Sequence, residues 1–174
     1  MGAPVRDFPN QEFVIPARGK PLAVIPAIGA QLMSLSWIDD IRTWQAPNYD
    51  DDGIGLLADT LTEVTPTDGF IGTADHLESH LHMPLANFKR LENLLTSRKI
   101  VGDMRITQSL RLVKSPSEIA KIRHAAQIAS RAFARAPEIA RLGAPLSQVI
   151  RQFQMLCLDE GADRLPNLAG GDGQ

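Results

Sequence analysis

The sequence has few of the features that mark secreted or membrane-bound proteins. Its 174 residues include a single cysteine, Cys157, so no intramolecular disulfide can form and a reducing compartment suits the chain. No apolar run approaches the roughly 20 residues that cross a bilayer as a helix. The first residues also lack the apolar segment of a signal peptide. We therefore expect a cytoplasmic protein without a membrane partner.

The charges of the chain are nearly balanced. Lysine and arginine total 18 and aspartate and glutamate total 20, which gives a net charge of −2. Such a balance provides no general electrostatic attraction to nucleic acid or to an anionic membrane, and we expect neither partner. Hydrophobic residues make up 44% of the sequence, which is enough for a packed core and argues against wholesale disorder.

Up to about residue 108, short apolar runs alternate with turn residues and predict an α/β layer domain. Residues 13–15 and 22–25 flank a segment with glycine and prolines, which predicts a β-hairpin. We expect further strands at 31–37, 69–72 and 99–103, a helix over 53–62, and a second helix that begins at Pro84.

The pattern changes near residue 110, where two longer helices are expected. Ser115, Pro116 and Glu118 form a capping-box arrangement that predicts the start of a helix. Pro137 should kink or end this helix, and a second helix should run over 146–160 until Gly161. We therefore place a domain boundary between residues 108 and 115, with domains over 1–110 and 111–174.

Both predicted helices carry an apolar stripe that lacks an obvious partner. The stripes comprise Ile119, Ile122, Ala126, Ala129 and Phe133 on the first helix, and Leu146, Val149, Ile150, Phe153 and Leu156 on the second. Exposed apolar surface of this extent favours association, so we expect a dimer or a larger species.

Three groups of residues could form a metal site or a catalytic site, but each has a simpler interpretation. His76, His80 and His82 could bind zinc if 76 and 80 shared a helix face, but a surface segment is the better account. The aspartates at 50–52 could bind a hard cation, although capping of the following helix explains them better. Cys157 lies on an apolar helix face, which indicates a buried structural thiol rather than a nucleophile.

Several segments resemble the creatinase, prolidase and aminopeptidase P family. The most specific is the stretch over 110–123, which begins Leu-Arg-Leu-Val-Lys-Ser-Pro-Ser-Glu-Ile and resembles the linker and first catalytic-domain helix of that family. The segments 143–147 and 158–163 continue the resemblance, although Gln148 stands where the family has an acidic residue. The segments 37–44 and 82–85 resemble a prolidase-like branch.

The resemblance implies an architecture: a creatinase-type amino-terminal domain, with a mixed sheet and flanking helices, followed by the first helices of a truncated pita-bread catalytic domain. In this family two aspartates, a histidine and two glutamates hold two divalent metals, often manganese, cobalt or zinc. All five ligands come after the segment that residues 165–171 resemble. No residue of this chain therefore inherits a catalytic or metal-ligand role, and we expect no cofactor in it.

The resemblance also suggests roles for Arg42 and Trp44. In relatives the amino-terminal domain of one subunit often reaches the active site of its neighbour with aromatic or arginine side chains. Arg42 could pair with a substrate carboxylate and Trp44 could wall an apolar pocket, so both are candidates for a substrate gate in a homodimer. The alternative is that Trp44 only packs in the core or in an interface.

Three functions remain open at this point. The chain could be the amino-terminal portion of an Xaa-Pro peptidase-like hydrolase, contributing dimerisation and substrate gating without activity of its own. It could be a non-enzymatic interaction module. It could also be a fragment of a non-peptidase relative, either creatinase-like or dimethylsulfoniopropionate-lyase-like. In the first case the full-length parent would act on a small peptide or a small amide.

Overall fold

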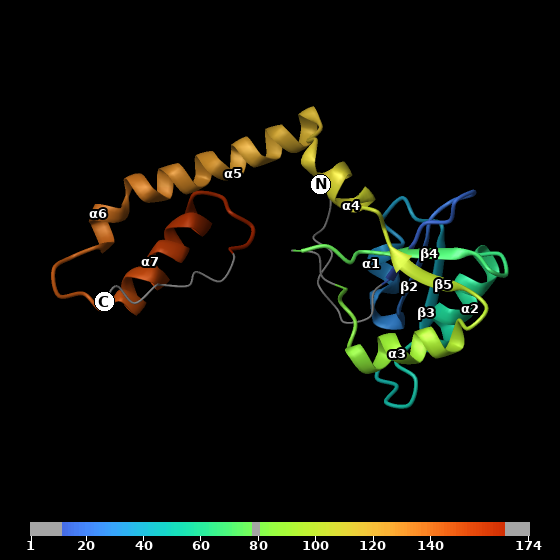
Figure 1. Cartoon of the computed structure of the whole chain (residues 1–174). Coiled ribbons are helices and arrows are strands. Elements are labelled where there is room, and N and C mark those ends of the chain that lie inside the picture. Colours follow the sequence, from blue (N-terminus) through green and yellow to red (C-terminus); the bar gives the residue numbers. More distant parts are fainter. Residues whose placement is uncertain (1–11, 78–80, 166–174) are drawn as a thin grey trace. The chain divides into compact units, whose positions relative to one another are not determined.

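The chain folds as two compact units, residues 1–109 and 110–174, and each is described by itself (Figure 1). The structure is a computed structural model that describes residues 12–77 and 81–165. It confirms the predicted α/β class, with a small mixed sheet, a two-stranded parallel sheet and flanking helices. Within these described ranges, no helix is both long enough and apolar enough to cross a membrane.

A three-stranded sheet opens the first unit. β1 (Glu12–Val14) and β2 (Leu22–Pro26) form the predicted hairpin, and β3 (Asp40–Trp44) pairs parallel with β2 in the order β1-β2-β3. The side chains of β2 alternate between the two faces, as a strand requires, and the whole strand is buried. β2 is therefore the centre of this sheet on both faces.

The strand predicted over 31–37 is wrong. That region contains a short 3₁₀ turn, η1 (Ala27–Gly29), and a short helix, α1 (Ala30–Met33), while the strand comes later, at β3. β2 and β3 are parallel, so the chain between them must return along the sheet instead of turning back as a hairpin. Only Met33 of α1 is buried, where it packs with Ile38 against one face of β2.

The rest of the first unit follows the predicted alternation of helix and strand. α2 (Ile54–Val64) is followed by β4 (Phe70–Thr73), α3 (Leu85–Leu94) and β5 (Lys99–Gly102), and β4 and β5 pair parallel as a two-stranded sheet. Residues from both sheets join α2 and α3 in one hydrophobic core, made of Val14, Leu22, Val24, Ile54, Leu57, Ala58, Leu61, Leu91 and Leu95, with Ile71 and Ile100 packed against it. The two sheets therefore share the same helical cover.

A short helix, α4 (Ile106–Leu112), crosses the division between the units and was not predicted. The second unit then contains α5 (Pro116–Ala134), α6 (Ala136–Ile139) and α7 (Leu146–Asp159). The capping box at Ser115 and Glu118 is confirmed, with both reciprocal hydrogen bonds present. The predicted break at Pro137 is also confirmed, because α5 ends just before the turn that contains it.

The two longer helices of the second unit pack against each other over part of their length. Ala132 of α5 is buried with Leu156 and Cys157 of α7, and the rings of Phe133 and Phe153 lie 4.6 Å apart between centroids. The amino-terminal half of α5 has no such cover within the described chain, since Ile119 and Ile122 are 45% and 56% exposed. The predicted stripe thus has an intramolecular partner at one end only.

Candidate functional site

Three side chains with metal-ligand or acid–base chemistry meet where β4 and β5 end. Asp75 and His76 follow β4, and Asp103 follows β5 directly. Because parallel strands carry their carboxyl ends to the same edge of a sheet, residues about 30 positions apart become neighbours there. The N–H of Asp103 donates a 2.9 Å hydrogen bond to the carbonyl of Thr73, which holds the carboxyl ends of β4 and β5 together.

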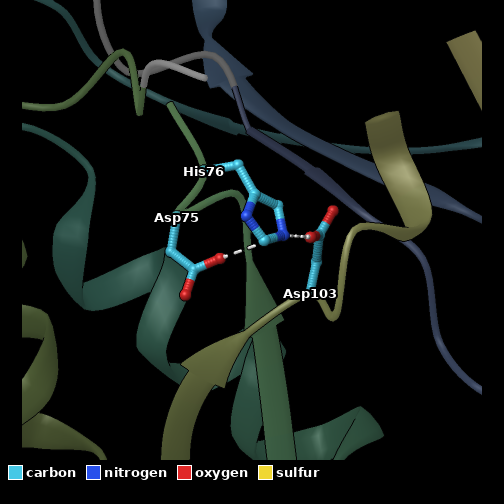
Figure 2. A group of neighbouring side chains, drawn as sticks. All are labelled: Asp75, His76 and Asp103. Atoms are coloured by element: carbon cyan, nitrogen blue, oxygen red, sulfur yellow. Dashed lines mark ion pairs between the residues drawn. The ribbon is translucent and has the colours of Figure 1, made fainter. Parts of the chain in front are cut away.

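His76 lies between the two carboxylates (Figure 2). Its Nε2 is 3.7 Å from Asp75 Oδ1 and 3.6 Å from Asp103 Oδ1, and its side chain is 29% exposed. Nε2 itself is buried and has no hydrogen-bond partner. Asp75 in turn lies against Gly102, where any side chain would collide with its carboxylate. The strand ends are thus shaped around this cluster.

Asp103 also stabilises the start of a helix. Its carboxylate accepts hydrogen bonds from the N–H groups of Arg105 and Thr107, at 2.9 and 3.0 Å, and so caps the start of α4. Hydrogen bonds from Thr107 are the main cause that lowers the pKa of Asp103, so this carboxylate carries its negative charge readily. The cluster thus places a carboxylate that also caps a helix beside His76.

The same cluster is a poor fit to the metal centre that the family resemblance implies. One histidine and two aspartates are fewer donors than a two-metal centre needs, and they do not follow the order of two aspartates, a histidine and two glutamates. In the described ranges, no other group of three such residues brings its ligand atoms within 4.8 Å of one another. No catalytic step is therefore assigned to a metal in this chain.

The histidine pattern singled out in the sequence has a different environment from the one predicted. His76 lies in an irregular segment after β4 rather than in a helix, His80 falls outside the described residues, and His82 is exposed. The neighbours of His76 are instead two aspartates that sequence spacing did not suggest. The signal for them was the position of Asp75 and Asp103 after two successive predicted strands.

The acidic run before α2 acts as a local cap, as predicted. Both carboxylate oxygens of Asp51 accept from the N–H of Gly55, at 3.0 and 3.2 Å, although the residue at the cap position itself is Gly53. Arg90 of α3 pairs with Asp51 at 2.9 Å, and Asn87 donates to Asp52 at 3.1 Å. The acidic run therefore joins α2 to α3.

Arg42 on β3 is held by an extensive network. It donates five hydrogen bonds, two to Asp40, two to Glu63 and one to Thr60. A guanidinium has five N–H groups, so each one is used. Hydrogen bonds to Glu63 and then to Asp40 raise the pKa of Arg42 and fix its charge. To bind a substrate carboxylate, Arg42 would have to exchange one of these partners.

Trp44 ends β3 and is partly buried against the core shared by the two sheets. Trp44 therefore contributes to the packing of this core. The candidate pair Arg42 and Trp44 lies on β3, two positions apart. Side chains two apart in a strand point to the same face. Cys157 is buried on α7, and burial raises the pKa of its thiol, which suits the predicted structural role.

A further feature, which the sequence did not suggest, is a pocket of about 460 Å³ in the first unit between β1 and β4. Glu12 lines it, and the Oε1 atom of Glu12 is buried without a hydrogen-bond partner. Burial raises the pKa of Glu12 to about 6, and the nearby His82 opposes that shift.

Comparison with known proteins gives matches among solved structures. No family model matches the sequence, and no curated protein matches it. A prolidase from Thermococcus sibiricus superimposes with a TM-score of 0.71 at 16% identity, over 87% of this chain and 39% of that one. The chain shares the fold of part of a prolidase. The resemblance seen in the sequence is thus confirmed at the level of the fold.

Two further structures have the same relationship to the chain. An Xaa-Pro dipeptidase from Bacillus anthracis gives a TM-score of 0.68 at 17% identity, over 91% of this chain and 41% of that one. An X-Pro aminopeptidase from Thermotoga maritima gives 0.62 at 22% identity, over 82% and 36%. The chain therefore spans about two-fifths of the length of the structures that it matches.

Proposed function

We propose that the chain is the amino-terminal, non-catalytic portion of an Xaa-Pro peptidase-like hydrolase, and that it contributes dimerisation and substrate gating. The observation that carries this proposal is the partial fold match, which covers most of this chain but only 39% of the prolidase. In this proposal residues 1–110 are a creatinase-type amino-terminal domain, and residues 111–174 are the linker and the start of a pita-bread domain.

The parent protein would hold two divalent metals, manganese, cobalt or zinc, on residues outside this chain and would act on a small peptide. The gate would be formed by Arg42 and Trp44 from one subunit of a homodimer. Every N–H of Arg42 is engaged and Trp44 is partly buried against the core, so both side chains would have to exchange contacts to meet a substrate. Arg42 would then bind the carboxylate of the substrate in place of the carboxylate of Asp40 or Glu63.

The proposal predicts that the purified 174-residue chain does not hydrolyse an Xaa-Pro dipeptide such as Ala-Pro, with or without added Mn²⁺, Co²⁺ or Zn²⁺. A full-length Xaa-Pro dipeptidase assayed in parallel serves as the positive control. Turnover that requires metal and disappears with a chelator would contradict the proposal. In that event Asp103→Asn would show whether the Asp75–His76–Asp103 cluster is responsible.

Two alternatives are separated by the gene sequence downstream of these residues. Two aspartates, a histidine and two glutamates in the expected order support a metallohydrolase parent. Their loss supports a non-peptidase relative, creatinase-like or dimethylsulfoniopropionate-lyase-like. A non-enzymatic interaction module is favoured by one observation, the exposed amino-terminal half of α5, and the association experiment described in the Discussion addresses it.

A further inference from the structure

The cluster of Asp75, His76 and Asp103 has the donor set of a site for a single metal ion. Each residue offers one ligand atom, and these atoms all lie within 4.8 Å of one another. They are one imidazole nitrogen and two carboxylate oxygens, and Figure 2 shows the His76 ring between the two carboxylates. Zn²⁺ and similar divalent ions bind this combination of nitrogen and oxygen in proteins. The cluster is too small for two metals but sufficient for one.

The distances in the cluster suit a metal ion better than a hydrogen bond. His76 Nε2 lies 3.7 Å from Asp75 Oδ1 and 3.6 Å from Asp103 Oδ1, whereas an N–H···O hydrogen bond spans about 2.7–3.2 Å. Ligand bonds of about 2.0–2.2 Å at a tetrahedral angle place neighbouring ligand atoms about 3.4 Å apart. Both observed separations lie within about 0.3 Å of that value. A metal ion therefore needs only a small closure of the site.

His76 supplies an observation that is independent of the two aspartates. Its Nε2 is buried and has no hydrogen-bond partner among the described residues. Burying a polar atom costs free energy unless it is paired, so such an atom calls for an explanation. A metal ion between the carboxylates would be bound directly by this nitrogen.

The two carboxylates bring negative charge together without a lysine or an arginine to offset it. Across residues 12–77 and 81–165, only His76 forms an ion pair with Asp75 or Asp103. The side chain of Asp103 is only 11% exposed, so water screens its charge less than at an open surface. A divalent cation would offset both charges at once.

The surrounding chain holds both aspartates in position. The carboxylate of Asp103 accepts from the N–H groups of Arg105 and Thr107, and because a carboxylate oxygen has two acceptor positions, Oδ1 keeps one for a metal. Asp75 lies against Gly102, where the absence of a Cβ leaves room for its carboxylate. Hydrogen bonds and packing of this kind orient metal ligands and increase affinity.

The imidazole ligand selects among divalent ions. Ca²⁺ takes six to eight oxygen ligands and Mg²⁺ is bound by carboxylates and water, whereas imidazole suits Zn²⁺ and its transition-metal neighbours. Three protein ligands leave the fourth position of a tetrahedral Zn²⁺ for water.

We propose that Asp75, His76 and Asp103 bind one Zn²⁺ or a similar divalent transition-metal ion, which joins the carboxyl ends of β4 and β5 to the start of α4. His76 binds through Nε2 and each aspartate through Oδ1. The role of this ion is structural, and no reaction is assigned to it. The proposal uses only residues of the first unit and does not depend on the peptidase relationship.

The test adds Zn²⁺ to the metal-free full chain labelled with ¹⁵N. Isothermal titration calorimetry should show one Zn²⁺ bound per chain. In NMR spectra of the imidazole nitrogens, the Nε2 signal of His76 should shift on binding, while the signals of His82 and His124 stay in place. Mg²⁺ at the same concentration should not shift the signal of His76, because it binds an imidazole poorly.

Conservative variants measure the part of each carboxylate. Loss of a residue that only orients a ligand already weakens metal binding about 10–100-fold, so Asp75→Asn should weaken Zn²⁺ binding at least about tenfold. Asp103→Asn should do the same, and because asparagine is also a good helix cap, this variant separates metal binding from the stability of α4. His82→Ala is the matched control at an exposed histidine of the same segment and should leave the Kd unchanged.

Three results would overturn the proposal. One is the absence of Zn²⁺ binding to the unaltered chain, and another is binding that leaves the Nε2 signal of His76 unchanged. The third is equal affinity of the unaltered chain and Asp75→Asn when circular dichroism shows that both are folded. The NMR measurement needs no variant, so it decides the proposal by itself. None of these results bears on the proposed function, which is tested by dipeptide hydrolysis and by the downstream gene sequence.

Discussion

Gly53 lies directly against the indole ring of Trp44, so a side chain at position 53 would collide with the ring. Gly53 also has a φ of 81°, a left-handed conformation that favours glycine. The contact joins the end of β3 to the start of α2. The position of the Trp44 ring therefore depends on the absence of a Cβ at Gly53, the residue at the cap position of α2.

Gly53→Ala should therefore destabilise the first unit by two separate effects. The left-handed conformation costs about 1–2 kcal/mol for alanine, and overpacking against Trp44 adds about 1–3 kcal/mol. Gly19→Ala is the matched control, because Gly19 also has a positive φ of 104° but has only Pro16 Cγ, at 4.0 Å, near its missing Cβ. Urea denaturation measures both, and equal losses would show that the ring moves aside freely.

Glu12 should make the stability of the chain fall as the pH rises from about 4.5 to 6. Burial raises the pKa of Glu12 to about 6 from its ordinary 4.5, so the folded state keeps this proton after the unfolded state has lost it. The cost at higher pH is up to about 2 kcal/mol. The urea midpoint of Glu12→Gln should change less with pH across this range than that of the unaltered chain. Glu92→Gln, which replaces an exposed carboxyl of α3, should keep the original pH dependence. Identical pH profiles for the two variants would place Glu12 in contact with solvent.

The capping box at the start of α5 should contribute measurably to the second unit. The Ser115 hydroxyl accepts from the N–H of Glu118 at 3.3 Å, and the Glu118 carboxylate accepts from the N–H of Ser115 at 2.7 Å. Ser115→Ala should cost about 1 kcal/mol and reduce helicity measured by circular dichroism. Ser117→Ala, at the second residue of α5, removes a serine without removing the cap and should cause no loss. Equal effects of the two changes would argue against the cap.

The exposed half of α5 predicts association of the chain. Ile119 and Ile122 are 45% and 56% exposed, and burying such surface stabilises a complex by roughly 25 cal/mol per Å². Sedimentation velocity should show a dimer or larger species whose population rises with concentration. Replacing both isoleucines by lysine should give a monomer, whereas Lys121→Gln on the same helix should not. A monomer at all concentrations for the unaltered chain would contradict this prediction and the proposed homodimer.

Local signals predicted local structure well. The hairpin of β1 and β2 needs only a turn and two apolar runs close in sequence, and the start of α5 needs only the residues from Ser115 to Glu118. The helix α4 was missed because it is only seven residues long and its start depends on the Asp103 cap. The strand expected over 31–37 was wrong because the parallel pairing of β2 with β3, a long-range contact, decides where that strand lies.

The sequence by itself determined the α/β class, the helix boundaries at Ser115 and Pro137, and the similarity to prolidases, because these depend on residue patterns within short windows. Only the tertiary structure decided that His76 lies between Asp75 and Asp103, that every N–H of Arg42 is engaged, and that a pocket lies between β1 and β4. These features join residues that are distant along the chain. Their proximity arises from parallel strand pairing and from packing on shared helices, which spacing in the sequence does not encode.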